Sequence, residues 1–162
     1  MTDTSIPARS RSAFLASEDW WAVWLGLFIF ALGAGRIGDV NLLGWVPKFG
    51  VWMDPAKAVA ANSPAFSWLG GAGTVIAAYL FVLILTTAGA WFMGARIKRF
   101  IAGFSVLYWL TIAANILGNY AYLAATPDKR AAFHITWSLS LGELGFVFAL
   151  VAGLIIGNFF PS

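Results

Sequence analysis

The feature that most constrains this chain is a long stretch between Lys57 and Arg96 that contains no charged residue. About 20 consecutive apolar residues are enough for a helix to cross the hydrocarbon core of a bilayer. Over the whole chain 60% of the residues are hydrophobic and 10% are charged, whereas soluble domains carry roughly a quarter charged residues. So few charges would not cover the surface of a soluble domain. The sequence therefore predicts an integral membrane protein.

Four apolar segments predict an all-α fold, an integral membrane bundle of about four transmembrane helices. We expect a polar N-terminal arm over 1–16 and a transmembrane domain over 17–162, with approximate spans at 18–36, 67–95, 99–125 and 136–159. Ser63-Pro64 predicts a helix start, and Thr126-Pro127-Asp128 predicts a helix end. The segment 37–66 contains prolines and aromatic residues, so we expect an interfacial loop that rests on headgroups or packs over the helix ends.

The first span begins with Ser17-Glu18-Asp19, where a serine can cap free N–H groups and two acids suit the positive end of the helix dipole. Three tryptophans follow between positions 20 and 24, and tryptophan prefers the headgroup level. A secretory signal peptide is the competing interpretation, because Arg9 and Arg11 precede the apolar stretch. The acids and tryptophans at its entrance favour a membrane helix.

The orientation depends on where lysine and arginine lie in a four-span topology. Five of these residues fall on each side: Arg9, Arg11, Arg96, Lys98 and Arg99 against Arg36, Lys48, Lys57, Lys129 and Arg130. The first set lies close to the spans, whereas Lys48 and Lys57 belong to a long loop. We therefore expect both termini in the cytoplasm.

Glu143 and three asparagines are the candidate intramembrane polar site. Glu143 is the one acid inside the last apolar run, and an ionised carboxylate there costs a few kcal/mol, so it needs a partner or a proton. Alternatively, Glu143 lies near the end of its helix and reaches the headgroups. Asn115 and Asn119 share one helix face, where interhelical hydrogen bonding is the commoner role and contact with a polar solute is the other. Asn158 completes the set.

Two further groups of residues are expected to make contacts. Ala149, Gly153 and Gly157 place small residues at every fourth position of the last span, which is typical of a helix packing face. The basic face formed by Arg96, Lys98 and Arg99 is expected to attract anions.

Several classes of chemistry find no support in the sequence, and we predict no enzyme activity, no catalytic residues and no nucleic-acid partner. Cysteine is absent and His134 is the only histidine, so neither a thiol nucleophile nor a metal site built on histidines is expected. Gly70-Gly71-Ala72-Gly73 follows no strand, which favours close helix packing over a phosphate loop. The sequence specifies no cofactor, and pigment, haem or lipid between the helices all stay open.

Three stretches carry a resemblance to a known family: SEDWWAVWLG at 17–26, VPKFGVWMDP at 46–55 and ALVAGLIIGN at 149–158. Together they resemble the N-terminal region of the sulfate exporter family of the YeiH type, in its long form. The resemblance implies a multi-pass protein of the bacterial inner membrane in which these helices precede a larger core, with a small anion as cargo. Members of that family continue for several further helices.

Two functions are predicted from different classes. The leading hypothesis is a transport-related membrane module that acts as a fragment or with a partner supplying the core. The alternative is a non-transporting accessory subunit of a larger membrane complex, such as a respiratory or photosynthetic assembly. In either case we expect contacts with the lipid bilayer and with other membrane subunits or further copies of this chain.

Overall fold

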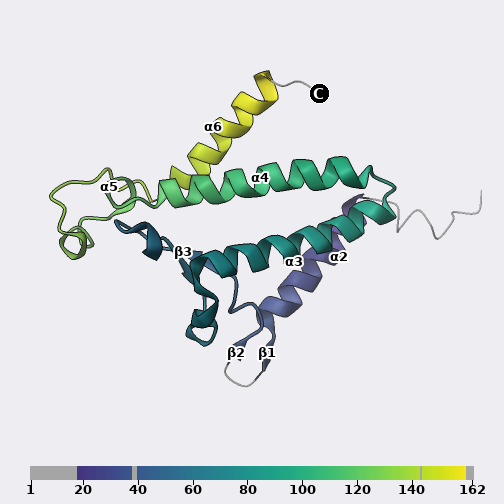
Figure 1. Ribbon diagram of the computed structural model, residues 1–162, viewed down its shortest axis with the longest axis horizontal. Coiled ribbons are helices and arrows are strands. Elements are labelled where there is room, and N and C mark those ends of the chain that lie inside the picture. The colour runs from purple at the N-terminus through teal and green to yellow at the C-terminus, as the bar shows by residue number, and fades with distance from the viewer. Residues whose placement is uncertain (1–17, 38–39, 143, 160–162) are drawn as a thin grey trace, which may run out of the picture.

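The computed structural model describes residues 18–37, 40–142 and 144–159. The described chain is mostly helical, with two short β-hairpins (Figure 1). Its longer helices are α2 (Glu18–Ala34), α3 (Gly70–Phe92), α4 (Ile97–Gly118) and α6 (Leu144–Phe159). The expected arm over 1–16, the cap at Ser17 and the candidate Glu143 lie outside the described residues.

Two of these helices are long and apolar enough to cross a membrane by length and composition, namely α3 together with the turn before it (Pro64–Phe92) and α4. The core helix of a soluble protein would be mostly buried, yet only 22% of the apolar window in Pro64–Phe92 and 11% of that in α4 are buried within the chain. The shorter helices α2 and α6 are also apolar. The structure thus confirms a helical protein with two candidate spans and does not confirm a bundle of four.

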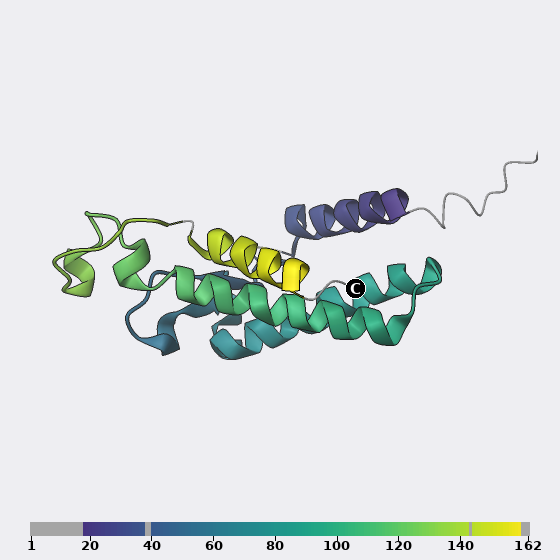
Figure 2. The same ribbon diagram turned by 90° about the horizontal axis from the view of Figure 1, so that it is seen from above.

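The helices α3 and α4 form a side-by-side pair (Figure 1, Figure 2) joined through a tight turn at Gly94. The Tyr79 hydroxyl lies 2.6 Å from the Ser105 hydroxyl, and the Tyr108 hydroxyl donates a 2.8 Å hydrogen bond to the Val75 carbonyl. These bonds satisfy polar groups that lipid would not satisfy.

The other two helices touch this pair at opposite ends. The ring of Trp21, at the start of α2, stacks on Phe92 at the end of α3 with a centroid distance of 5.1 Å. The start of α6 packs on the end of α4 and the rest of α6 diverges from it (Figure 1). This divergence leaves most of α6 uncovered within the described chain.

The third and fourth expected spans differ from the observed helices. The α4 helix ends at Gly118, short of position 125, and only a single turn, α5 (Ala121–Ala124), follows. The segment expected to begin the last helix at 136 instead pairs with α5, through bonds from the Leu139 N–H to the Tyr122 carbonyl (2.9 Å) and from the Leu141 N–H to the Leu123 carbonyl (2.8 Å). The helix therefore starts later, at Leu144.

The remaining elements are short: the first hairpin lies beyond the end of α2, and the others lie at one end of the α3–α4 pair, which we call the loop end (Figure 1). One hairpin joins β1 (Arg36–Ile37) to β2 (Val40–Asn41), and another joins β3 (Pro47–Phe49) to β4 (Val59–Ala61). Among the residues that the structure describes there are also three 3-10 turns: η1 (Pro55–Lys57), η2 (Pro64–Leu69) and η3 (Ala131–Phe133). Pro64 occupies the first turn of η2 as predicted, although the Ser63 side chain forms no cap bond.

Candidate functional site

The loop between β3 and η1 is fixed to the end of α4 by Trp52. Its indole N–H donates a 2.7 Å hydrogen bond to the Ile116 carbonyl, one of the last carbonyls of the helix. Its backbone N–H donates to the Asn119 carbonyl (3.1 Å), and its carbonyl accepts from the Ala121 N–H (2.8 Å). Carbonyls at a helix C-terminus have no partner within the helix. Trp52 therefore closes the helix end and holds the loop over it.

A second set of bonds organises the segment between α5 and α6 around the Ala125 carbonyl. The Ser138 and Ser140 hydroxyls both donate to this carbonyl. The Arg130 guanidinium bonds the Ser138 carbonyl and both hydroxyls at 3.1 Å. The guanidinium is thus engaged in holding the segment together. His134, in the same segment, is exposed and has a left-handed φ of 53°.

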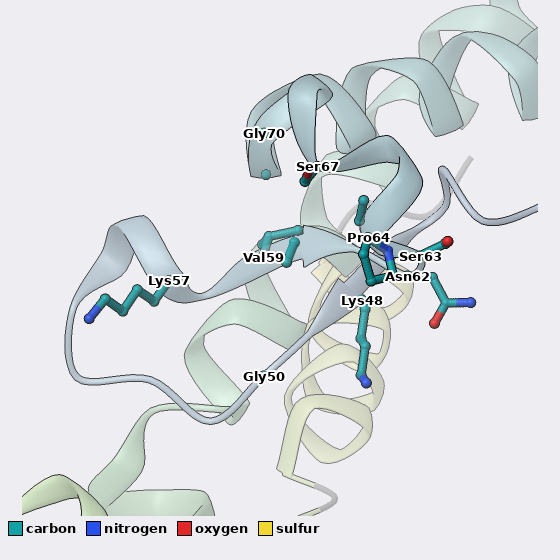
Figure 3. Close-up of a pocket in the computed structure, with 12 residues that line it drawn as sticks. Lys48, Gly50, Lys57, Val59, Asn62, Ser63, Pro64, Ser67 and Gly70 are labelled. Atoms are coloured by element: carbon teal, nitrogen blue, oxygen red, sulfur yellow. The ribbon is translucent and has the colours of Figure 1, made fainter.

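A pocket of about 430 Å³ opens where the β3–β4 hairpin meets the start of α3 (Figure 3). Lys48 and Lys57 line opposite parts of it, and their side chains point away from each other and from Gly70 and Ser67 (Figure 3). The ammonium groups therefore do not converge on one bound atom. Among the described residues no cluster of three or more His, Cys, Asp or Glu could hold a metal ion.

The packing at the start of α3 explains the glycines at the beginning of the second span. A Cβ on Gly71 would lie 2.3 Å from the Val59 carbonyl oxygen, so only glycine lets β4 approach the helix this closely. Gly70 has a φ of 62°, a conformation that favours glycine. The motif is therefore closely packed, although its neighbour is the strand β4 instead of another helix.

The three candidate asparagines all hydrogen-bond to their own helices. The amide of Asn115 donates to the Thr111 carbonyl (2.9 Å), that of Asn119 to the Asn115 carbonyl (2.9 Å) and that of Asn158 to the Leu154 carbonyl (2.8 Å). Asn115 and Asn119 lie near the end of α4, whereas Asn158 lies near the end of α6. Within the described part of the chain they do not form one polar site.

A close approach of two helices, α4 and α6, is made by glycines that the sequence analysis did not select. A Cβ on Gly118 of α4 would lie 2.2 Å from the backbone nitrogen of Gly145 in α6. A Cβ on Gly145 would in turn lie 3.2 Å from the Asn115 Cα. By contrast, Gly153 and Gly157 have nothing within 4 Å of a Cβ, so the expected face with Ala149 makes no comparable contact among the described residues.

The predicted basic face lies at the start of α4, where Arg96 caps the helix and Lys98 and Arg99 fall in its first turn, at the end of the pair opposite the loop end (Figure 1). The side chains of Arg96, Lys98 and Arg99 are all exposed. The exposed Trp91 and Trp20 lie at the same end, and the exposed Trp68 lies at the loop end. Tryptophan at both ends of the spans is typical of the two headgroup regions of a bilayer.

Comparison with known proteins gives one informative relative. Over 155 residues, 93% of this chain, the sequence is 34% identical to a UPF0324 membrane protein of Nitrosomonas europaea. The matched region makes up 32% of the relative, so the chain spans about a third of its length. No family model and no solved structure matches the chain. With the two long apolar helices, this similarity supports a membrane protein.

Proposed function

We propose that the chain is a transport-related membrane module that helps to move a small anion such as sulfate. The observation that carries the proposal is the exposure of Arg96, Lys98 and Arg99 on one turn, at the end of two candidate spans. Clustered positive charge raises the local concentration of anions and their rate of arrival. The similarity to a longer membrane protein supports the membrane location that this proposal requires.

In this proposal α2, α3, α4 and α6 all cross a bacterial inner membrane, with both termini on the cytoplasmic side. At 1.5 Å per residue the 17 residues of α2 and the 16 of α6 extend about 25 Å, slightly less than the ~30 Å hydrocarbon core. Flanking residues complete these two spans, or the bilayer thins around them. The contacts of α2 and α6 at opposite ends of the α3–α4 pair support this alternating topology.

The anion path itself requires helices beyond those described. Transport sites form where two sets of helices meet near the middle of the membrane. The candidate asparagines are bonded to their own helices instead of facing a shared cavity. In the proposal this chain gathers anions and supports the path, and partner helices or further copies complete it.

The test is sulfate flux into vesicles, using the protein purified in mild detergent with whatever subunits accompany it. We expect flux that falls when Arg96, Lys98 and Arg99 are all changed to glutamine, with the largest effect at low salt, where exposed charges are least screened. A matched control changes Lys129, which is exposed near the loop end. Flux no greater than in protein-free vesicles, with the protein folded and inserted, would refute the proposal.

A non-transporting accessory subunit is the second candidate, and the uncovered face of α6 favours it. Phe146, Leu150 and Leu154 are 56–68% exposed on this helix, and Gly153 offers room for a close neighbour. In this proposal α6 packs against other membrane subunits. Mild purification followed by mass spectrometry distinguishes the two: other membrane chains in fixed ratio together with no anion flux support an accessory role.

A further inference from the structure

The segment between α5 and α6 has its polar side chains turned inward and its apolar side chains turned outward. The side chains of Trp137, Leu139 and Leu141 are 57%, 54% and 50% exposed. They alternate with Ser138 and Ser140, which are half-buried. At a surface in contact with water, serine is mostly exposed and large apolar residues are mostly buried. Three large apolar side chains presented together indicate a surface that contacts an apolar environment.

The polar groups of this segment are satisfied within the chain. The two serine hydroxyls both donate to the Ala125 carbonyl, and both accept from the Arg130 guanidinium. The N–H groups of Leu139 and Leu141 donate to carbonyls of α5 at 2.9 and 2.8 Å. Lipid offers few hydrogen-bonding groups, so a non-helical segment beside it must bond its polar groups internally. The segment meets this requirement, and the half-buried Arg130 is used on its inner side.

The segment lies at the level where a candidate membrane span ends. It pairs with α5, which lies just beyond the end of α4, and then leads into α6 (Figure 1). Gly118, the last residue of α4, packs against Gly145 near the start of α6. When α4 crosses the membrane, the segment is therefore next to the end of the hydrocarbon core. The headgroup layer there is about 5–8 Å thick, which is the difference between half of ~40–45 Å and half of ~30 Å.

We propose that residues 137–141 form a contact with the surface of the lipid bilayer. The Trp137 ring lies among the phospholipid headgroups, where tryptophan is enriched. It stacks on Tyr122 of α5 with a centroid distance of 5.2 Å, so α5 sets its orientation. The side chains of Leu139 and Leu141 contact the upper parts of the acyl chains. The proposal rests on the membrane location and does not require anion transport.

Two observations favour lipid over a protein neighbour at this surface. The N–H groups of Leu139 and Leu141 are already bonded within the chain, so a neighbouring segment could not pair with them. Leu117, in the last turn of α4, is also 58% exposed, so the candidate span presents apolar surface up to the same end. Fluid acyl chains require only such side-chain contact.

Fluorescence quenching tests the position of the segment. The chain contains no cysteine, so one introduced cysteine gives a single labelling site. Leu139→Cys and Leu141→Cys are each labelled with an environment-sensitive fluorophore, purified in mild detergent with any subunits that accompany them, and reconstituted in phosphatidylcholine vesicles. We expect a lipid with a doxyl group near the headgroup end of its acyl chain to quench both labels about threefold more strongly than iodide in the water.

Control variants calibrate the measurement. Lys129→Cys and Ala131→Cys are exposed in the same loop and should be quenched more strongly by iodide. Leu107→Cys, 57% exposed in the middle of α4, should be quenched best by a doxyl group in the middle of the acyl chain. Stronger quenching by iodide at positions 139 and 141 would overturn the proposal. Protection of both labels from both quenchers would show that protein covers the segment and would overturn it equally.

A second measurement uses the unmodified chain. A phosphatidylcholine with a diazirine near its headgroup is expected to cross-link within 136–142, as identified by peptide mass spectrometry. Circular dichroism checks that each labelled variant keeps the helical content of the unmodified chain. Cross-links that spare 136–142 while marking the ends of α3 and α4 would contradict the proposed lipid contact.

Discussion

Replacing Gly118 with alanine should separate α4 from α6, because backbone atoms leave no room for a methyl group. A Cβ at this position would lie 2.2 Å from the Gly145 nitrogen, 2.5 Å from its Cα and 3.0 Å from the Leu144 carbonyl carbon. Backbone atoms cannot rotate away as a flexible side chain can. The two helices would have to move apart by roughly 1 Å to restore ordinary contact distances. We expect the free energy of unfolding to fall by about 1–3 kcal/mol, as in other overpacked cores.

The matched control is Gly103→Ala on the same helix, where nothing lies within 4 Å of the added Cβ. Alanine at this helix-interior position should raise the free energy of unfolding by about 0.5–1 kcal/mol. Both variants can be measured by reversible unfolding in mixed detergent micelles, followed by circular dichroism. Equal changes in the two variants would show that the close α4–α6 contact is absent in the protein and would refute this reasoning.

Three further perturbations test the loop end. Trp52→Phe keeps an aromatic ring but removes the hydrogen bond to the Ile116 carbonyl, so the free energy of unfolding should fall by about 1 kcal/mol in the same assay. Trp68→Phe is the control: this ring is 76% exposed, so its replacement should change the free energy of unfolding little. Arg130→Gln should increase proteolytic cleavage within 131–141, because three bonds to Ser138 and Ser140 are lost; Lys129→Gln should not. The pKa of Asp128 is lowered chiefly by a hydrogen bond from the Thr126 side chain, so Thr126→Val should raise this pKa in a carboxyl NMR titration. Because the folded-state pKa is lowered, the ionised carboxylate favours folding above its unfolded-state pKa, and this contribution is lost as the pH falls through the lowered value.

The sequence predicted the helical class and the second span well, because a long stretch without charge has few other solutions in lipid. The hydropathy of 99–125 was a weaker guide to where the third helix ends. The signal for the end was Gly118-Asn119, since glycine and asparagine are common at helix C-termini, but the apolar residues on both sides obscured it. The bond from the Trp52 indole could not be predicted, because it joins residues far apart in the sequence.

The candidate site was harder to predict than the fold. Polar residues on an apolar helix predict a shared site only if their side chains point across to a neighbour. The three asparagines donate instead to carbonyls four residues earlier, an alternative that their spacing does not exclude. In the same way, glycine spacing marked Gly153 and Gly157, while the observed close contact uses Gly118 and Gly145 from different helices. The spacing of residues along one helix does not show which other helix it packs against.

The two ends of the α3–α4 pair are built differently, and this asymmetry links the structure to the proposals. At the loop end, Trp52, Ser138 and Ser140 satisfy carbonyls through bonds from other segments, as is needed where little water is available. The Trp52 bonds hold the loop before η1 against the end of α4, and the serine bonds hold the segment between α5 and α6 in place. At the other end a tight turn leaves Arg96, Lys98 and Arg99 exposed. Under the proposed function, the bonds between segments keep one end of the helix pair rigid, and the exposed cations at the other end gather anions.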